Sequence, residues 1–113
     1  IPPHAERIFA GKSCKQKAMT QEEINALLIK LSGEGKDVVR LKGGDPMLFG
    51  RGGEEALVLQ EQGIPFEIIP GITSAQGCGA VAGIPLTHRG LATGVRFFTG
   101  HRMTKEEAGQ ELE

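Results

Sequence analysis

The sequence contains no tryptophan or tyrosine, only two cysteines, and no apolar run of the length that crosses a bilayer. Cys14 and Cys78 are far apart and in neither metal-ligand nor redox-motif spacing, so we expect reduced thiols in a cytoplasmic or organellar protein. The net charge of −1 excludes a broadly basic surface for nucleic acid. The three histidines lack paired spacing, which predicts no metal site.

Glycine is abundant instead, with 17 residues that follow or precede short apolar segments. These segments predict strands at residues 7–10, 37–42, 65–70 and 95–99. Helices are predicted behind a capping box at Thr20, over 54–62, from 74 to about 82, and behind a second capping box at Thr104. The alternation of strand and helix predicts an α/β fold with a parallel sheet flanked by helices.

The most informative stretch is Lys36–Glu55, KDVVRLKGGDPMLFGRGGEE, in which a strand runs into paired glycines. Glycines remove side-chain bulk, so main-chain groups can reach a small molecule, and Asp45 adds a carboxylate for a cation or a hydroxyl. A tight turn between a strand and a helix is the simpler alternative. The P-loop pattern is absent, and Glu54 and Glu55 stand where a phosphate would lie, which argues against a nucleoside triphosphate.

Four motifs in series, LKGGDP, FGRGGEE, PGITSA and GIPLTHRG, closely resemble the tetrapyrrole methylase family, and within it the enzymes that methylate uroporphyrinogen III. The resemblance covers residues 1–101. It implies an S-adenosylmethionine-dependent homodimer of two-domain α/β chains, which methylates two ring carbons of uroporphyrinogen III to give precorrin-2 for siroheme or cobalamin. A family member that acts on a later corrin precursor is an alternative.

Family members are considerably longer, so we expect an internal piece of such an enzyme. Residues 1–92 would be most of the N-terminal α/β domain with the interdomain connection, and residues 93–113 the start of the C-terminal domain. The family's general-base aspartate would lie upstream. A non-catalytic piece that binds the cofactor weakly or not at all is therefore a further alternative.

The resemblance implies that six residues contact S-adenosylmethionine: Gly43, Gly44, Asp45, Leu48, Thr73 and Ser74. From the residue types alone, Thr73 and Ser74 equally predict a helix N-cap.

Lys12 matches the lysine that is assigned as proton donor in the family. A contact with a substrate carboxylate and a solvated surface position are the alternatives. Nearby, Ser13 and Lys17 replace the arginine and histidine of the commoner bacterial pattern.

Three further residues, Arg51, His88 and Arg89, are candidate contacts for a polycarboxylate substrate, because cations bind carboxylates. Arg51 could equally form a structural ion pair with Glu54.

Overall fold

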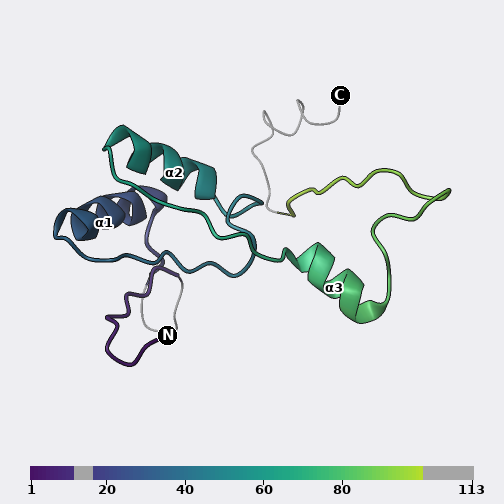
Figure 1. Ribbon diagram of the computed structural model, residues 1–113, viewed down its shortest axis with the longest axis horizontal. Coiled ribbons are helices and arrows are strands. Elements are labelled where there is room, and N and C mark those ends of the chain that lie inside the picture. The colour runs from purple at the N-terminus through teal and green to yellow at the C-terminus, as the bar shows by residue number, and fades with distance from the viewer. Residues whose placement is uncertain (12–16, 101–113) are drawn as a thin grey trace. The chain divides into compact units, whose positions relative to one another are not determined.

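The computed structural model describes residues 1–11 and 17–100, and these contain three helices, α1 (Gln21–Gly33), α2 (Gly52–Glu61) and α3 (Ser74–Ala82) (Figure 1). The chain divides into two compact units, Ile1–Gly71 and Ile72–Glu113. The first unit holds α1 and α2, and the second holds α3. The expected domain boundary between residues 92 and 93 falls inside the second unit and stays a prediction.

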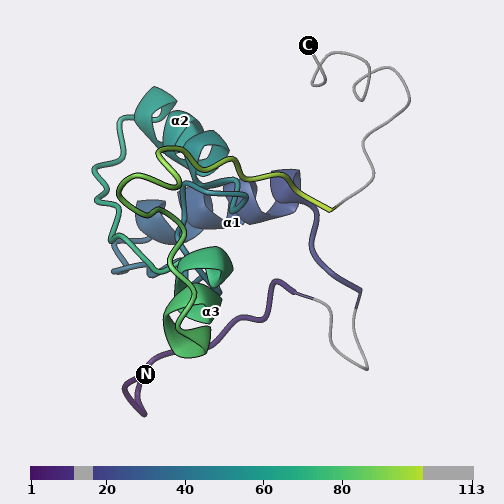
Figure 2. The same ribbon diagram turned by 90° about the vertical axis from the view of Figure 1, so that its right-hand side faces the viewer.

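Helix α1 begins as the sequence predicts. The Thr20 hydroxyl accepts a hydrogen bond from the Glu23 amide at 3.2 Å, and the Glu23 carboxylate accepts one from the Thr20 amide at 2.9 Å. A cap of this kind stabilises a helix by about 1 kcal/mol. Ile24 and Leu28 are the buried residues of α1, and the helix packs against α2, as both ribbon views show (Figures 1 and 2).

Helix α2 begins at Gly52, earlier than the predicted Glu54. The Gly52 amide donates to the Pro46 carbonyl at 2.9 Å, and this contact starts the helix without any side-chain cap from Arg51. Because glycine is a poor helix former, the sequence-based prediction excluded Gly52 and Gly53 and started the helix too late. Glu54 lies in the first turn, where a carboxylate is favoured by the helix dipole.

The predicted strands are not confirmed. Residues 37–42 and 65–70 run as extended chain (Figure 1), but residues 1–11 and 17–100 contain no β-strand, and their one β-bridge joins His88 to Ala92. An extended segment becomes a strand only when a neighbour pairs with its N–H and C=O groups, and within the described residues no backbone hydrogen bond joins these two segments. Val39 is accordingly 83% exposed. The parallel sheet therefore remains an expectation.

Helix α3 begins and ends where the sequence predicts, and Gly83 closes it in the left-handed conformation with φ of 71°. Residues 83–90 form an irregular connection, also as expected. The helix predicted behind Thr104 lies outside the described residues. In the part of the chain that the structure describes, no helix has the length and apolar character needed to cross a membrane.

Candidate active site

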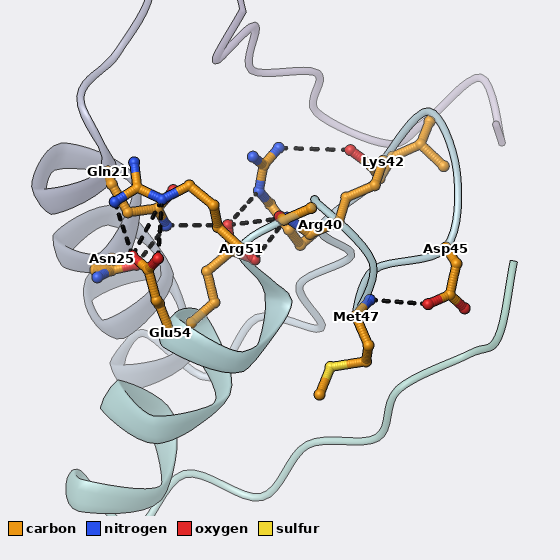
Figure 3. Close-up of polar contacts among 11 residues, drawn as sticks. Gln21, Asn25, Arg40, Lys42, Asp45, Met47, Arg51 and Glu54 are labelled. Carbon is orange, nitrogen blue, oxygen red and sulfur yellow. Dashed lines mark hydrogen bonds and ion pairs between the residues drawn. The ribbon is translucent and has the colours of Figure 1, made fainter. Parts of the chain in front are cut away.

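The side chain of Asp45 joins the GGDP loop to the Pro70-Gly71 segment. One carboxylate oxygen, Oδ1, accepts a hydrogen bond from the Gly71 amide at 3.0 Å. The other, Oδ2, accepts one from the Met47 amide at 3.0 Å (Figure 3). These bonds, first from Gly71 and then from Met47, hold the pKa of Asp45 below its usual range. Asp45 is thus a fixed anion that joins two chain segments, and its remaining lone pairs can still accept from a ligand.

Glycine is required at position 71 by this close approach. A Cβ atom there would lie 2.9 Å from the Gly44 carbonyl oxygen and 3.0 Å from the Asp45 nitrogen. Both are backbone atoms, which cannot move aside as a flexible side chain can. The absence of a side chain at Gly71 therefore lets the Pro70-Gly71 segment contact the GGDP loop directly.

The far end of the loop is equally compact. A Cβ atom on Gly50 would lie 2.7 Å from the Pro46 carbonyl oxygen, and one on Gly52 would lie 2.4 Å from it. Phe49 and Arg51 adopt left-handed φ values of 53° and 56°, which non-glycine residues rarely do. These glycines serve contact between backbone segments.

Gly43 differs from Gly50 and Gly52. A Cβ atom on Gly43 would meet nothing within 4 Å, and its φ is not in the left-handed region. The space beside Gly43 is therefore open, and no intramolecular contact explains a glycine there. This is the point in the loop where the sequence-based prediction of an exposed backbone fits the structure.

A charged cluster lies at the base of the same loop, centred on Glu55, whose side chain is 6% exposed. Its carboxylate accepts from Gln21 Nε2 at 3.1 Å, from Arg40 Nε at 3.2 Å and from Lys42 Nζ at 3.1 Å. Lys42 also donates to the Gly50 carbonyl. Burial raises the pKa of Glu55. The hydrogen bonds from Gln21, Lys42 and Arg40 together lower this pKa by more than burial raises it, so the net pKa is below the ordinary value.

Sequence reasoning missed this cluster, although a signal was present. Arg40 and Lys42 are two residues apart in an extended segment, so their side chains point to the same face. Two cations on one face of an otherwise apolar segment indicate a partner carboxylate when another element covers that face. Glu55 supplies that carboxylate, and it directly follows Glu54, the residue that the sequence pairs with Arg51.

Arg51 forms the ion pair that the sequence offered as an alternative to substrate contact. Its Nη2 lies 2.8 Å from Glu54 Oε2, and its Nε donates to both carboxylate oxygens at 3.1 Å (Figure 3). Both side chains are more than half exposed. Contact between Arg51 and a substrate stays a prediction.

The structure brings together four of the predicted cofactor contacts, which share one loop: Gly43, Gly44, Asp45 and Leu48. Thr73 and Ser74 belong to the second unit, where Thr73 holds the N-cap position of α3 but makes no capping hydrogen bond with its side chain. Thr73 therefore occupies the predicted N-cap position, but its hydroxyl does not cap the helix.

His88 and Arg89 also belong to the second unit and lie in the turn that the His88–Ala92 bridge closes. His88 Nδ1 lies 2.9 Å from the Arg89 carbonyl oxygen. Lys12 lies outside the described residues. Within residues 1–11 and 17–100 no group of His, Cys, Asp or Glu side chains is arranged to hold a metal ion, and Cys78 is a free, exposed thiol.

A cavity of about 810 Å³ lies beside the loop and is lined by Gly44, Pro46 and Gly71 as well as by both extended segments, residues 36–42 and 64–71. Its volume is in the range of small-molecule sites. However, the cavity follows both extended segments rather than stopping at the glycines, so its volume alone does not define a ligand pocket. Gly44 and Pro46 of the GGDP loop line this cavity, whereas Gly43 and Asp45 do not.

Comparison with known proteins assigns the family. Residues 2–112 match the model of the tetrapyrrole (corrin/porphyrin) methylases. The siroheme synthase of Azotobacter vinelandii is 63% identical over 97 residues, which are 86% of this chain and 21% of that protein. The chain thus spans about a fifth of the length of the curated relatives that it matches.

Solved structures similar to this chain support the same family assignment. The uroporphyrin-III-C-methyltransferase of Thermus thermophilus is 64% identical with a TM-score of 0.62, over 66% of this chain and 34% of that one. A second structure of that enzyme, complexed with S-adenyl homocysteine, is 57% identical with a TM-score of 0.56, over 66% and 32% of the two chains. The chain belongs to the tetrapyrrole (corrin/porphyrin) methylase family.

Proposed function

We propose that the chain is part of an S-adenosylmethionine-dependent C-methyltransferase that methylates two ring carbons of uroporphyrinogen III to give precorrin-2. The observation that carries this proposal is the family match over residues 2–112. It is supported by the likeness to a uroporphyrin-III C-methyltransferase that was solved with S-adenyl homocysteine. The predicted role in siroheme formation is supported by the relatives named siroheme synthase.

The proposed cofactor contacts are Gly43, Gly44, Asp45, Leu48, Thr73 and Ser74. The open space at Gly43 fits a ligand that approaches the main chain, and backbone groups offer neutral hydrogen bonds to an amino-acid head, a ribose and an adenine. The Thr73 hydroxyl is not used in a cap, which leaves it for the ligand. When bound, S-adenosylmethionine supplies an electrophilic methyl group on a sulfonium.

For methyl transfer, the main task of the protein is to align the ring carbon, the methyl group and the sulfur. The bond between sulfur and methyl breaks as the bond between methyl and the ring carbon forms. That carbon is already fully substituted, so a base then removes a proton from elsewhere on the tetrapyrrole or assists its tautomerisation. Lys12 is the proposed proton donor. Arg51, His88 and Arg89 are proposed to bind substrate carboxylates, and Arg51 would do so while sharing its guanidinium with Glu54.

The proposal extends to the architecture and cellular location of the complete enzyme. Residues 37–42 and 65–70 would be strands of a parallel sheet in the complete enzyme. That enzyme would be a cytoplasmic homodimer. A methylase that acts on a later corrin precursor is the second candidate, because the family match alone covers both corrin and porphyrin methylases.

Titration calorimetry with S-adenosylmethionine and S-adenosylhomocysteine tests cofactor binding. Transfer of isotope-labelled methyl to uroporphyrinogen III, followed by mass spectrometry, tests the reaction and should reveal two added methyl groups per tetrapyrrole. Labelling of a later corrin precursor instead of uroporphyrinogen III would favour the second candidate. Absence of any heat with either ligand would favour a non-catalytic chain.

A further inference from the structure

We propose that Glu55 is a positioning residue for cofactor binding, which acts through Lys42 to hold the loop Gly43–Gly50 in its binding conformation. Glu55 itself would touch no cofactor. The proposal rests on the function proposed above, because it assigns the loop that Glu55 holds to S-adenosylmethionine.

The first step of the argument is the position of Lys42. It is the residue directly before Gly43, and its side chain is 11% exposed. Its Nζ donates to the carbonyl of Gly50, at the other end of the loop. Lys42 therefore joins the two ends of the loop, and the distance between them depends on where its ammonium group is held.

The second step is what holds that ammonium group. Both carboxylate oxygens of Glu55 contact Lys42 Nζ, Oε1 at 3.2 Å and Oε2 at 3.1 Å. Glu55 is in turn held by Gln21 from α1 at 3.1 Å and by Arg40 at 3.2 Å. Three elements of the first unit thus meet at one buried carboxylate, which places Lys42 against Gly50.

The third step is that the other hydrogen bonds described for the loop are formed by Asp45 and Pro46, in its middle. Asp45 binds the amides of Met47 and Gly71, and Pro46 accepts from Gly52. In the described residues, Lys42 is the side chain that bonds across the base of the loop. Loss of its partner would widen the base, move Gly43 and weaken the hydrogen bonds that the Met47 and Gly52 amides form with the loop.

The experiment compares Glu55→Gln, Lys42→Met and the double variant by titration calorimetry, at a temperature where circular dichroism shows each one folded. Each single variant should weaken cofactor binding roughly tenfold, and the double variant should lose no more than either, because both act through one contact. Lys42→Arg should recover most of the affinity. Glu54→Gln, an exposed carboxylate on the same helix turn, is the matched control and should leave the dissociation constant unchanged.

A comparison of two ligands separates position from charge. Glu55→Gln leaves two cations near the loop, which would repel the sulfonium of S-adenosylmethionine but not the neutral sulfide of S-adenosylhomocysteine. A positioning role predicts the same loss for both ligands. Weaker binding of S-adenosylmethionine alone would overturn the proposal.

Amide hydrogen exchange without ligand tests the loop independently of cofactor binding. The Met47 and Gly52 amides, which are bonded within the loop and at its end, should exchange faster in Lys42→Met and Glu55→Gln but not in Glu54→Gln. Unchanged exchange at both amides in Lys42→Met would refute the positioning role. If the unmodified chain bound neither ligand, the proposed function would fail while this measurement still decided whether Glu55 orders the loop.

Discussion

Substitution of Gly52 by alanine should destabilise the first unit, although alanine normally favours a helix. The new Cβ atom would lie 2.4 Å from the Pro46 carbonyl oxygen and 2.9 Å from the Pro46 carbonyl carbon. The overlap involves backbone atoms, so relief requires a shift of α2 or of the loop. Such overpacking costs roughly 1–3 kcal/mol. The shift also strains the hydrogen bond from Gly52 to Pro46, which contributes roughly 1 kcal/mol.

Alanine recovers roughly 0.5–1 kcal/mol through its helix preference, so the net loss should be about 2 kcal/mol. For a domain of this size each kcal/mol moves the melting temperature by roughly 4–8 °C, so Gly52→Ala should melt about 10 °C lower. Circular dichroism during heating measures this shift. Gly53→Ala is the matched control, because its Cβ atom would meet only Met47 Cε at 3.9 Å.

Gly53→Ala should be neutral or stabilising by less than about 1 kcal/mol. Equal melting temperatures for the two variants would refute the reasoning, because they differ only in proximity to Pro46. A drop in both would mean that the first turn of α2 tolerates no side chain at all.

Three further predictions follow from the same contacts and from the resemblance. Asp45→Ala should weaken cofactor binding about tenfold, since the loop loses its bonds to the Gly71 and Met47 amides, and an unchanged dissociation constant would count against the loop assignment. The folded protein lowers the pKa values of Asp45 and Glu55 from 3.8 and 4.5, so both carboxylates stabilise the fold fully above these values. This stabilisation is lost as the pH falls through the lower folded pKa values. The melting temperature measured across an acid titration should show the loss, and the loss should be smaller in Glu55→Gln. Lys12→Met should lower turnover more than cofactor affinity, and the reverse pattern in steady-state kinetics and calorimetry would remove Lys12 from catalysis.

The helices were predictable because their signals are local. Thr20 and Glu23 are three residues apart and form the predicted capping box, and Gly83 closes α3 in the left-handed conformation that glycine favours. The start of α2 was misplaced because it depends on the Pro46 carbonyl, a contact that no helix propensity encodes.

The strands and the Glu55 cluster depend on partners distant in sequence. Residues 37–42 have the composition of a strand, but pairing needs a neighbour at the correct distance. Gln21 meets Glu55 across 34 positions, a separation that no periodicity reveals. The sequence indicated the GGDP loop as the most informative segment, but it did not reveal that the neighbouring Gly71 and Gly52 are needed for contact between backbone segments.

Calorimetric titration of Gly43→Ala with S-adenosylhomocysteine tests the central claim most directly. A Cβ atom at Gly43 touches nothing in the described structure, so the melting temperature should be unchanged, while a ligand pressed against that backbone should bind at least about tenfold more weakly. Gly33→Ala, at another open position at the end of α1, is the control and should leave the affinity unchanged, with a melting temperature that is unchanged or slightly higher. Undiminished affinity in Gly43→Ala would contradict the claim that the cofactor binds against the GGDP main chain.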